Sequence, residues 1–179
     1  MQFIGGLLAM KGPASSWSAK LYKEMKKAGI RLCVSLPDSW LSDLIVRMEA
    51  DPGMIHVPVS QEEEGVGVCC GAVAGGMRAA LVVQNVGVMN SLGALATFPI
   101  SYGIPFLLII SDRGRLGDQA FYDVEKGKNA RALLAQIGIQ HFDIPVDFYT
   151  QGTVSDAYGL AEAAQKPIAL LITRETFGA

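Results

Sequence analysis

The chain has 179 residues, half of them hydrophobic and 18% charged, so it can bury a core as one globular domain and is too apolar to be disordered. Its formal charge of −2 and pI of about 5.7 give no basis for binding nucleic acid or an anionic membrane. The three cysteines, two of them adjacent, do not form the paired framework of a small secreted protein, so we expect a cytoplasmic chain. A mean hydropathy of +0.31 favours a sheet that is buried on both faces or a surface that a partner covers.

Helix-like and strand-like segments alternate from near the start of the chain. Trp17, Leu21 and Met25 recur every four residues and predict a first amphipathic helix, which the next glycine ends. The sequence then predicts a strand at 30–35, a helix at 39–49, a strand at 55–59 and a helix of small residues from 62 to about 76.

Three continuous apolar runs have the composition of central parallel strands, which are buried on both faces. They are residues 80–84, 105–111 and 167–173. The segments between them predict a helix at 89–98, a polar loop at 112–128, a helix at 129–137, a weak strand just before 143–146 and a last helix at 154–164. This alternation predicts an α/β fold of three layers, with helices on both faces of a mostly parallel, six-stranded sheet.

The remaining chain carries fewer signals. Residues 3–9 form an apolar stretch that is too short to span a membrane and lacks the basic flank of a signal peptide. We expect residues 1–13 to be an N-terminal extension, in part disordered, and residues 14–179 to form one domain. His56 and His141 stand apart from the cysteines, and we expect no metal site in this chain.

Polar residues gather after four of the predicted strands, in the segments 37–39, 60–64, 84–90 and 111–117. In an open parallel sheet, ligands bind beyond the carboxyl ends of the strands. The sequence therefore predicts a ligand site at this edge of the sheet.

The segment from Gly65 to Gly71 follows a strand and opens a helix, as a dinucleotide-binding loop does, but its third glycine comes one residue late. The glutamates at 62–64 would also repel a pyrophosphate at that helix end. The small residues behind them favour a helix that packs closely, either on its own sheet or against a cofactor or a second subunit. We expect Cys69 and Cys70 to be small buried side chains and not nucleophiles.

The order Ser60-Gln61-Glu62-Glu63-Glu64-Gly65, with Gly71 nine residues after Glu62, resembles the pyrimidine-binding segment of thiamine diphosphate-dependent enzymes. The segments 37–39, 84–90 and 112–114 are similar to the corresponding loops of sulfopyruvate and phosphonopyruvate decarboxylases. The triple glutamate followed by Gly-Val-Gly is most similar to the α subunit of sulfopyruvate decarboxylases. Two positions depart from the family pattern: Asp112 stands where an aromatic residue is usual, and Gly71-Ala72-Val73 replaces a Gly-Tyr-Ala turn.

The resemblance implies a role for the glutamate that follows the second strand. In the family it hydrogen-bonds N1′ of the aminopyrimidine of thiamine diphosphate and so helps to remove the proton from the thiazolium C2. Successive helical residues point about 100° apart, so one of the three glutamates faces the ring, and we choose Glu62, with Glu63 in reserve. Gln84 and Asn85 end a buried strand, and we expect their amides to bind the cofactor or the backbone.

The resemblance also implies a small 2-oxo acid substrate with a second acidic group. We assign Arg113 to its sulfonate or phosphonate, because a guanidinium fork matches tetrahedral anions. An exposed loop arginine beside Asp112 and Asp118 is the competing interpretation. Asp38 and Ser39 either orient the substrate or make an Asx turn.

The other half of the cofactor site is missing from the sequence. In the family, a Gly-Asp-Gly motif with downstream asparagines holds Mg²⁺ and the diphosphate, and no Asp-Gly pair occurs in this chain. We therefore expect a β subunit with the diphosphate-binding domain, which binds Mg²⁺ and shares the thiamine diphosphate. Self-association through the pyrimidine-binding domain is also expected. The alternative function is a non-catalytic nucleotide-binding or regulatory α/β module.

Overall fold

The central sheet of the computed structural model is parallel throughout, with its strands in the order β2-β1-β3-β4-β6-β5. The structure describes residues 16–145 and 152–177, so the predicted extension at 1–13 lies outside the described residues. Within the described part, the strands are β1 (Leu32–Ser35), β2 (Ile55–Pro58), β3 (Ala79–Gln84), β4 (Leu107–Ser111), β5 (His141–Asp143) and β6 (Ile168–Ile172). The predicted six-stranded sheet is confirmed, and its strands are all parallel, not only most of them.

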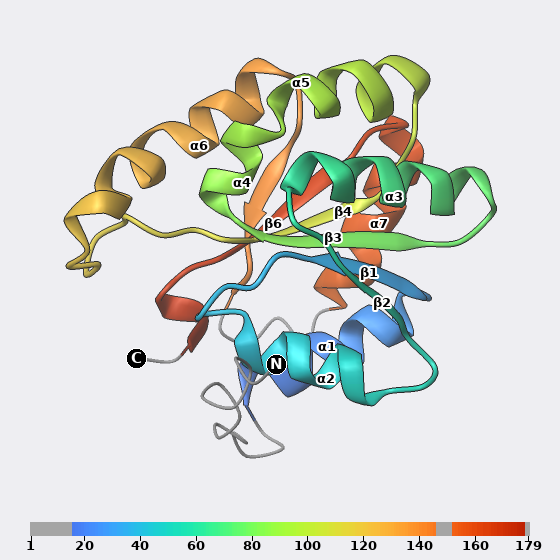
Figure 1. Cartoon of the computed structure of the whole chain (residues 1–179), viewed down its shortest axis with the longest axis horizontal. Helices are drawn as coiled ribbons and strands as arrows, with labels where there is room; N and C mark the ends of the chain where they lie inside the picture. Colours follow the sequence, from blue (N-terminus) through green and yellow to red (C-terminus); the bar gives the residue numbers. More distant parts are fainter. Residues whose placement is uncertain (1–15, 146–151, 178–179) are drawn as a thin grey trace.

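Helices cover both faces of this sheet, which confirms the three-layer α/β prediction (Figure 1). One face carries α1 (Trp17–Lys27), α2 (Ser42–Ala50) and α7 (Thr153–Ala164). The other face carries α3 (Glu62–Ala74), α4 (Asn85–Asn90), α5 (Leu92–Leu95), the π-helical turn η1 (Ala96–Ile100) and α6 (Val124–Gln136). Short 3-10 turns, η2 (Phe121–Asp123) and η4 (Glu175–Phe177), follow β4 and β6. Among the described residues, no helix is long and apolar enough to cross a membrane.

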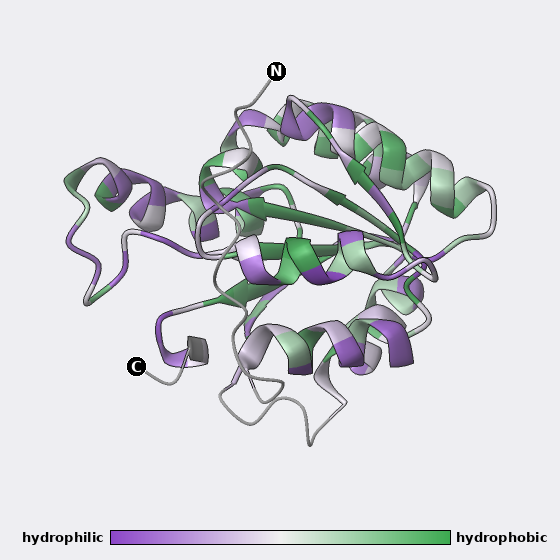
Figure 2. Ribbon diagram, turned by 60° about the horizontal axis from the view of Figure 1, so that its bottom comes forward, coloured by the Kyte–Doolittle hydropathy of each residue, from purple (hydrophilic) through white to green (hydrophobic). Residues whose placement is uncertain are grey.

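The central strands divide their side chains between two hydrophobic cores. In β3, Ala80 and Val82 lie in the core beneath α1, α2 and α7, whereas Leu81 and Val83 lie in the core beneath α3 to α6. This alternation follows from the period of two residues in a strand. Figure 2 shows the apolar strands between helices that carry polar residues on their outer sides. The continuous apolar runs in the sequence therefore mark strands that are buried on both faces, as predicted.

The small residues of α3 serve close packing on one side of the helix. A Cβ atom at Gly65 would lie 2.6 Å from Leu81 Cδ1, so a larger residue there would push α3 off the sheet. At Gly67 and Gly71 a Cβ atom would meet nothing within 4 Å. Packing on its own sheet accounts for Gly65, whereas Gly67 and Gly71 have no close neighbour within the described part of the chain.

The start of α6 differs from the sequence prediction. The segment 112–128 was expected to be a polar loop, but α6 begins at Val124, five residues before the predicted start at Asn129. Gly127 resembles a helix breaker in the sequence, yet it lies inside α6 because a Cβ atom there would collide with the carbonyl oxygen of Arg113. Close packing of two backbone segments has outweighed the low helix propensity of glycine.

The helix after β3 also begins earlier than predicted. α4 begins at Asn85, directly after the strand, whereas the sequence predicted a helix from Met89. Ser91 Oγ donates to the carbonyl oxygen of Gly87 at 2.7 Å, which closes the end of this short helix. Its Asn, Gly and Val residues are weak helix formers, so tertiary contacts and not propensity set its position.

A partly buried histidine, His56, joins β1, β2 and α2. Ser35 Oγ and His56 Nε2 are 2.8 Å apart, and Glu49 Oε1 lies 3.6 Å from His56 Nδ1. Burial lowers the pKa of His56 below its ordinary value of 6.5, and this effect outweighs the opposing effect of Glu49. The fold therefore favours the neutral imidazole.

This burial predicts an acid-sensitive fold. Because the folded pKa of His56 is lowered, its contribution to stability is complete above pH 6.5 and is lost as the pH falls through the folded pKa. We expect the free energy of unfolding in urea to decrease between pH 7.5 and pH 5, and to decrease less in His56→Gln. An equal pH dependence in the two proteins would contradict this account.

Candidate functional site

The carboxylate of Glu62 is buried at the carboxyl edge of the sheet. Glu62 is the first residue of α3 and is 8% exposed. Its side chain packs against α4, where a Cβ atom at Gly87 would lie 2.5 Å from Glu62 Cγ. Asn90 Nδ2 donates to Glu62 Oε2 at 3.4 Å. The absence of a side chain at Gly87 therefore makes room for this carboxylate.

The three consecutive glutamates have different surroundings. Glu64 Oε2 accepts hydrogen bonds from the backbone N–H groups of Ser60 and Gln61 at 3.0 and 3.2 Å, and so caps α3. Glu63 is exposed, and Glu62 alone of the three is buried. Glu64 therefore caps the helix and Glu63 is solvated. Glu62, which the sequence selected first, is the buried carboxylate of the three.

The structure brings together the three residues that were predicted to bind substrate. Arg113 Nη2 donates to Asp38 Oδ2 and to Ser39 Oγ, each at 2.7 Å. The Arg113 side chain is 13% exposed, and its Cζ atom lies 5.0 Å from the ring centroid of Trp40. The interpretation of Arg113 as an exposed loop arginine is therefore wrong.

Asp38 uses its two oxygens for different purposes. Oδ1 accepts from the backbone N–H groups of Trp40 and Leu41 at 2.9 and 3.2 Å, so the Asx turn that the sequence allowed is formed. Oδ2 pairs with Arg113. Because the Asp38 side chain is only 7% exposed, this carboxylate neutralises much of the charge of the guanidinium.

Asn85 supports the loop that carries Arg113. Its side chain is fully buried, and its Nδ2 donates to the carbonyl oxygen of Arg113 at 2.8 Å and to Asp112 Oδ1 at 3.4 Å. Gln84, the preceding residue, is half-buried at the end of β3. The contact of either amide with a cofactor stays a prediction, but Asn85 already has a positioning role within the chain.

Sequence reasoning missed the partner of Asp112. This carboxylate is 1% exposed and accepts from Arg131 Nε of α6 at 2.9 Å. Arg131 also donates to Asp143, at the end of β5, at 3.2 Å. A separation of 19 residues gives no local sequence signal for the first contact. A partly buried ion pair therefore ties α6 to the residue that follows β4.

Unpaired polar atoms gather at the ends of β3 and β4. Within the described structure, four buried atoms of this region have no hydrogen-bond partner: Asn85 Oδ1, Ser111 Oγ, Arg113 Nε and Asp123 Oδ2. Buried polar groups are nearly always satisfied, so these atoms mark hydrogen-bonding capacity that the described chain does not use. They lie beneath the surface at the predicted edge of the sheet.

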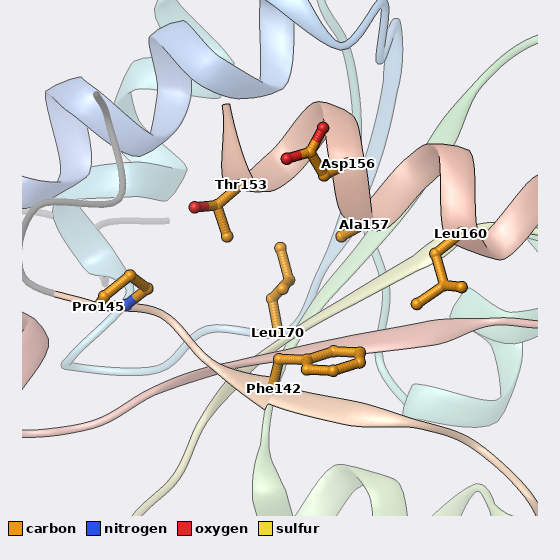
Figure 3. A pocket seen from close by; sticks show the side chains of 7 residues that line it. All are labelled: Phe142, Pro145, Thr153, Asp156, Ala157, Leu160 and Leu170. Atoms are coloured by element: carbon orange, nitrogen blue, oxygen red, sulfur yellow. The ribbon is translucent and has the colours of Figure 1, made fainter. Parts of the chain in front are cut away.

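Other features of the described residues lie outside this site. Cys33, Cys69 and Cys70 are buried thiols, and burial raises the pKa of Cys70 to about 11, so they are not activated nucleophiles. No group of three or more His, Cys, Asp or Glu side chains in the described segments is placed to hold a metal ion. A pocket of about 320 Å³ lies beside β5 and α7 (Figure 3). It is mainly apolar and is lined by Phe142, Pro145, Thr153, Asp156, Ala157, Leu160 and Leu170.

Comparison with protein-family models gives no match. Among curated proteins, the chain is 33% identical over 155 residues to the sulfopyruvate decarboxylase subunit alpha of Methanococcus maripaludis, across 87% of this chain and 93% of that protein. It is 34% identical over 161 residues to the protein of the same name in Methanocaldococcus jannaschii, across 86% of this chain and 91% of that protein. The phosphonopyruvate decarboxylase of Streptomyces viridochromogenes is 31% identical over 102 residues, which span 57% of this chain but 26% of that protein.

The contact between Glu62 and Gly87 can be tested without an activity assay. In Gly87→Ala, the added methyl group displaces the Glu62 carboxylate toward solvent, and strain lowers the free energy of unfolding by about 1–3 kcal/mol. We expect a water-soluble carbodiimide to modify Glu62 several-fold faster than in the wild-type chain, as measured by peptide mass spectrometry. Gly93→Ala, on α5 with nothing within 4 Å of its Cβ position, is the matched control. Equal protection of Glu62 in both variants would show that Gly87 does not hold the carboxylate.

Proposed function

Because the chain belongs to the family of sulfopyruvate decarboxylase α subunits, we propose that it is the pyrimidine-binding subunit of a two-chain thiamine diphosphate-dependent decarboxylase. Its substrate is an acidic 3-substituted pyruvate, either sulfopyruvate or phosphonopyruvate. The observation that carries this proposal is the buried carboxylate of Glu62 at the start of α3, at the edge of the sheet where ligands bind.

Glu62 is the residue that we assign to the aminopyrimidine. When bound, thiamine diphosphate supplies the carbon nucleophile and accepts the electrons that departing carbon dioxide leaves behind. Glu62 would hold a proton at N1′ of the ring, because its carboxylate is the buried acid of the 62–64 cluster. Gly87 and Asn90 keep the carboxylate in place. Gln84 lies on the same edge and is the further proposed cofactor contact, with Asn85 behind it.

The proposed substrate group is formed by Asp38, Ser39 and Arg113. The three side chains converge from the loops after β1 and β4, which are two strands apart in the sheet. Asn85 and the close approach of Gly127 fix the backbone of the Arg113 loop. Because these contacts hold the Arg113 loop in place, the loop would need little rearrangement when substrate binds.

A partner chain would complete the cofactor site. The match to the Streptomyces phosphonopyruvate decarboxylase spans only 26% of that protein, whereas the match to the Methanococcus α subunit spans 93%. The sequence has no Asp-Gly pair, and the described residues hold no metal-ligand group. We infer that a β subunit with a diphosphate-binding domain supplies the Mg²⁺ and diphosphate contacts in a cytoplasmic hetero-oligomer, with self-association through the pyrimidine-binding domains. A nucleotide-binding module is disfavoured by the acidic start of α3.

The proposed role of Glu62 is to share a proton with N1′ of the cofactor, and a substitution that removes its acid tests this role. Glu62→Gln keeps the shape of the side chain but removes the acid, so we expect hydrogen–deuterium exchange at C2 of the bound cofactor to slow by about 10²-fold or more. Glu63→Gln is the matched control, because Glu63 is exposed and carries the same substitution. Exchange is measured by NMR on acid-quenched samples of the assembled complex.

The two variants distinguish the alternatives. Suppression in Glu63→Gln alone would move the role to the reserve residue. Normal exchange in both variants, with cofactor bound, would leave the acidic cluster as a helix cap and contradict the proposal.

The need for a partner predicts the behaviour of the isolated chain. Without the diphosphate and Mg²⁺ contacts, we expect the pure chain to bind thiamine diphosphate more weakly than the micromolar range and to have no decarboxylase activity. Titration calorimetry with cofactor and Mg²⁺ measures the first property. Micromolar binding by the pure chain would rule out the two-chain arrangement.

A further inference from the structure

Arg113 is poorly suited to be the sole cation that recognises a doubly anionic substrate. Its Nη2 is occupied by Asp38 and Ser39, and Asp123 Oδ2 lies 3.9 Å from its Nη1. An incoming acidic group must compete with these carboxylates or find a second cation nearby. The side chains around the Trp40 ring include such a second cation.

Arg174 lies beside the same indole ring. Its Cζ atom is 6.0 Å from the ring centroid of Trp40, to which Arg113 Cζ is also close at 5.0 Å. Both guanidinium groups lower the pKa of Asp118, after the larger effect of its hydrogen bond from the Gly114 N–H. The two arginines therefore act on one small region, although they follow different strands.

Arg174 also lines a cleft. This cleft has a volume of about 400 Å³ and lies between the loop after β4, α6 and the segment after β6. Its cationic lining residues are Arg115, Lys128, Arg131 and Arg174, and its acidic ones are Asp143 and Glu175. A volume of this size accommodates the substituent of a small 2-oxo acid.

Three of the four cations in the cleft already have acidic partners. Arg115 and Arg131 lie 3.7 and 2.7 Å from Asp112, and Lys128 lies 3.7 Å from Glu125. Their charges are therefore largely balanced within the chain.

Arg174 keeps its hydrogen-bonding capacity. The interactions found for its side chain among the described residues are the contact with the Trp40 ring and the electrostatic effect on Asp118. The oxygens of nearby Asp118 accept from the backbone N–H groups of Gly114 and Ala120. A Cβ atom at Gly117 would lie 3.3 Å from Arg174 Cδ, so the loop backbone packs against the arginine stem.

We propose that Arg174 binds the acidic group on C3 of the substrate and thereby determines the preference of the enzyme for acidic pyruvates. This inference rests on the proposed function and adds a residue to the substrate group of Asp38, Ser39 and Arg113. A guanidinium presents its donors in a plane that matches sulfonate and phosphonate oxygens. Both guanidinium groups lie within 6.0 Å of the Trp40 ring centroid, so Arg174 is close to the proposed substrate group.

The test uses the assembled two-chain complex with sulfopyruvate. We expect Arg174→Ala to lower kcat/KM roughly 10- to 100-fold, mainly through KM, because a charge-assisted contact to the substrate is lost. The inhibition constant of 3-sulfopropanoate, which has both anions but no keto carbon, should rise by a similar factor. Arg174→Lys should retain part of the affinity. Arg31→Ala is the matched control, because Arg31 is an exposed arginine just before β1.

The outcomes separate this inference from the proposed function. Unchanged KM and inhibition constants in Arg174→Ala, or a loss confined to kcat, would refute the role of Arg174 while the wild-type activity stands. A wild-type complex that decarboxylates neither sulfopyruvate nor phosphonopyruvate would refute the proposed function, and the role of Arg174 with it.

Discussion

The packing of Glu62 against Gly87 is the contact on which the candidate site depends. A carboxylate at 8% exposure is costly unless its surroundings satisfy it, and the described chain offers only a long hydrogen bond from Asn90. α3 connects β2 to β3 across the intervening β1, and so packs against α4, which follows β3 directly. Glycine at position 87 then removes the one side chain that would displace the carboxylate. A buried acid with spare hydrogen-bonding capacity is what proton exchange with a bound ring requires.

The second part of the site depends on an equally tight backbone contact. Gly114 and Gly127 allow the loop after β4 to pass directly over the first turns of α6. Asn85 donates to the Arg113 carbonyl oxygen, and the partly buried pair of Asp112 and Arg131 holds α6 against the end of β4. These contacts give Arg113 a defined position, from which it reaches Asp38 across the edge of the sheet. The rigidity of this loop therefore comes from packing and not from its sequence propensity.

The sequence was sufficient for the fold and for part of the site. Apolar runs that are buried on both faces identify the central strands, and their alternation with helices determines the layers. The beginnings of α4 and α6 were misplaced because their glycines are required by contacts distant in the chain, at Glu62 and Arg113. Contacts between residues that are distant in the sequence produce no periodic pattern from which the start of a helix could be predicted. Family resemblance selected Glu62, whereas the role inferred for Arg174 depends on its nearness to Trp40, which only the folded chain reveals.

A structure of the assembled complex with thiamine diphosphate and Mg²⁺ bound would test the central claim most directly. We expect N1′ of the aminopyrimidine to lie within hydrogen-bonding distance of the Glu62 carboxylate, about 2.6–3.2 Å, with the diphosphate and the metal on the partner chain. An aminopyrimidine bonded to Glu63, or a cofactor held entirely by one chain, would contradict it.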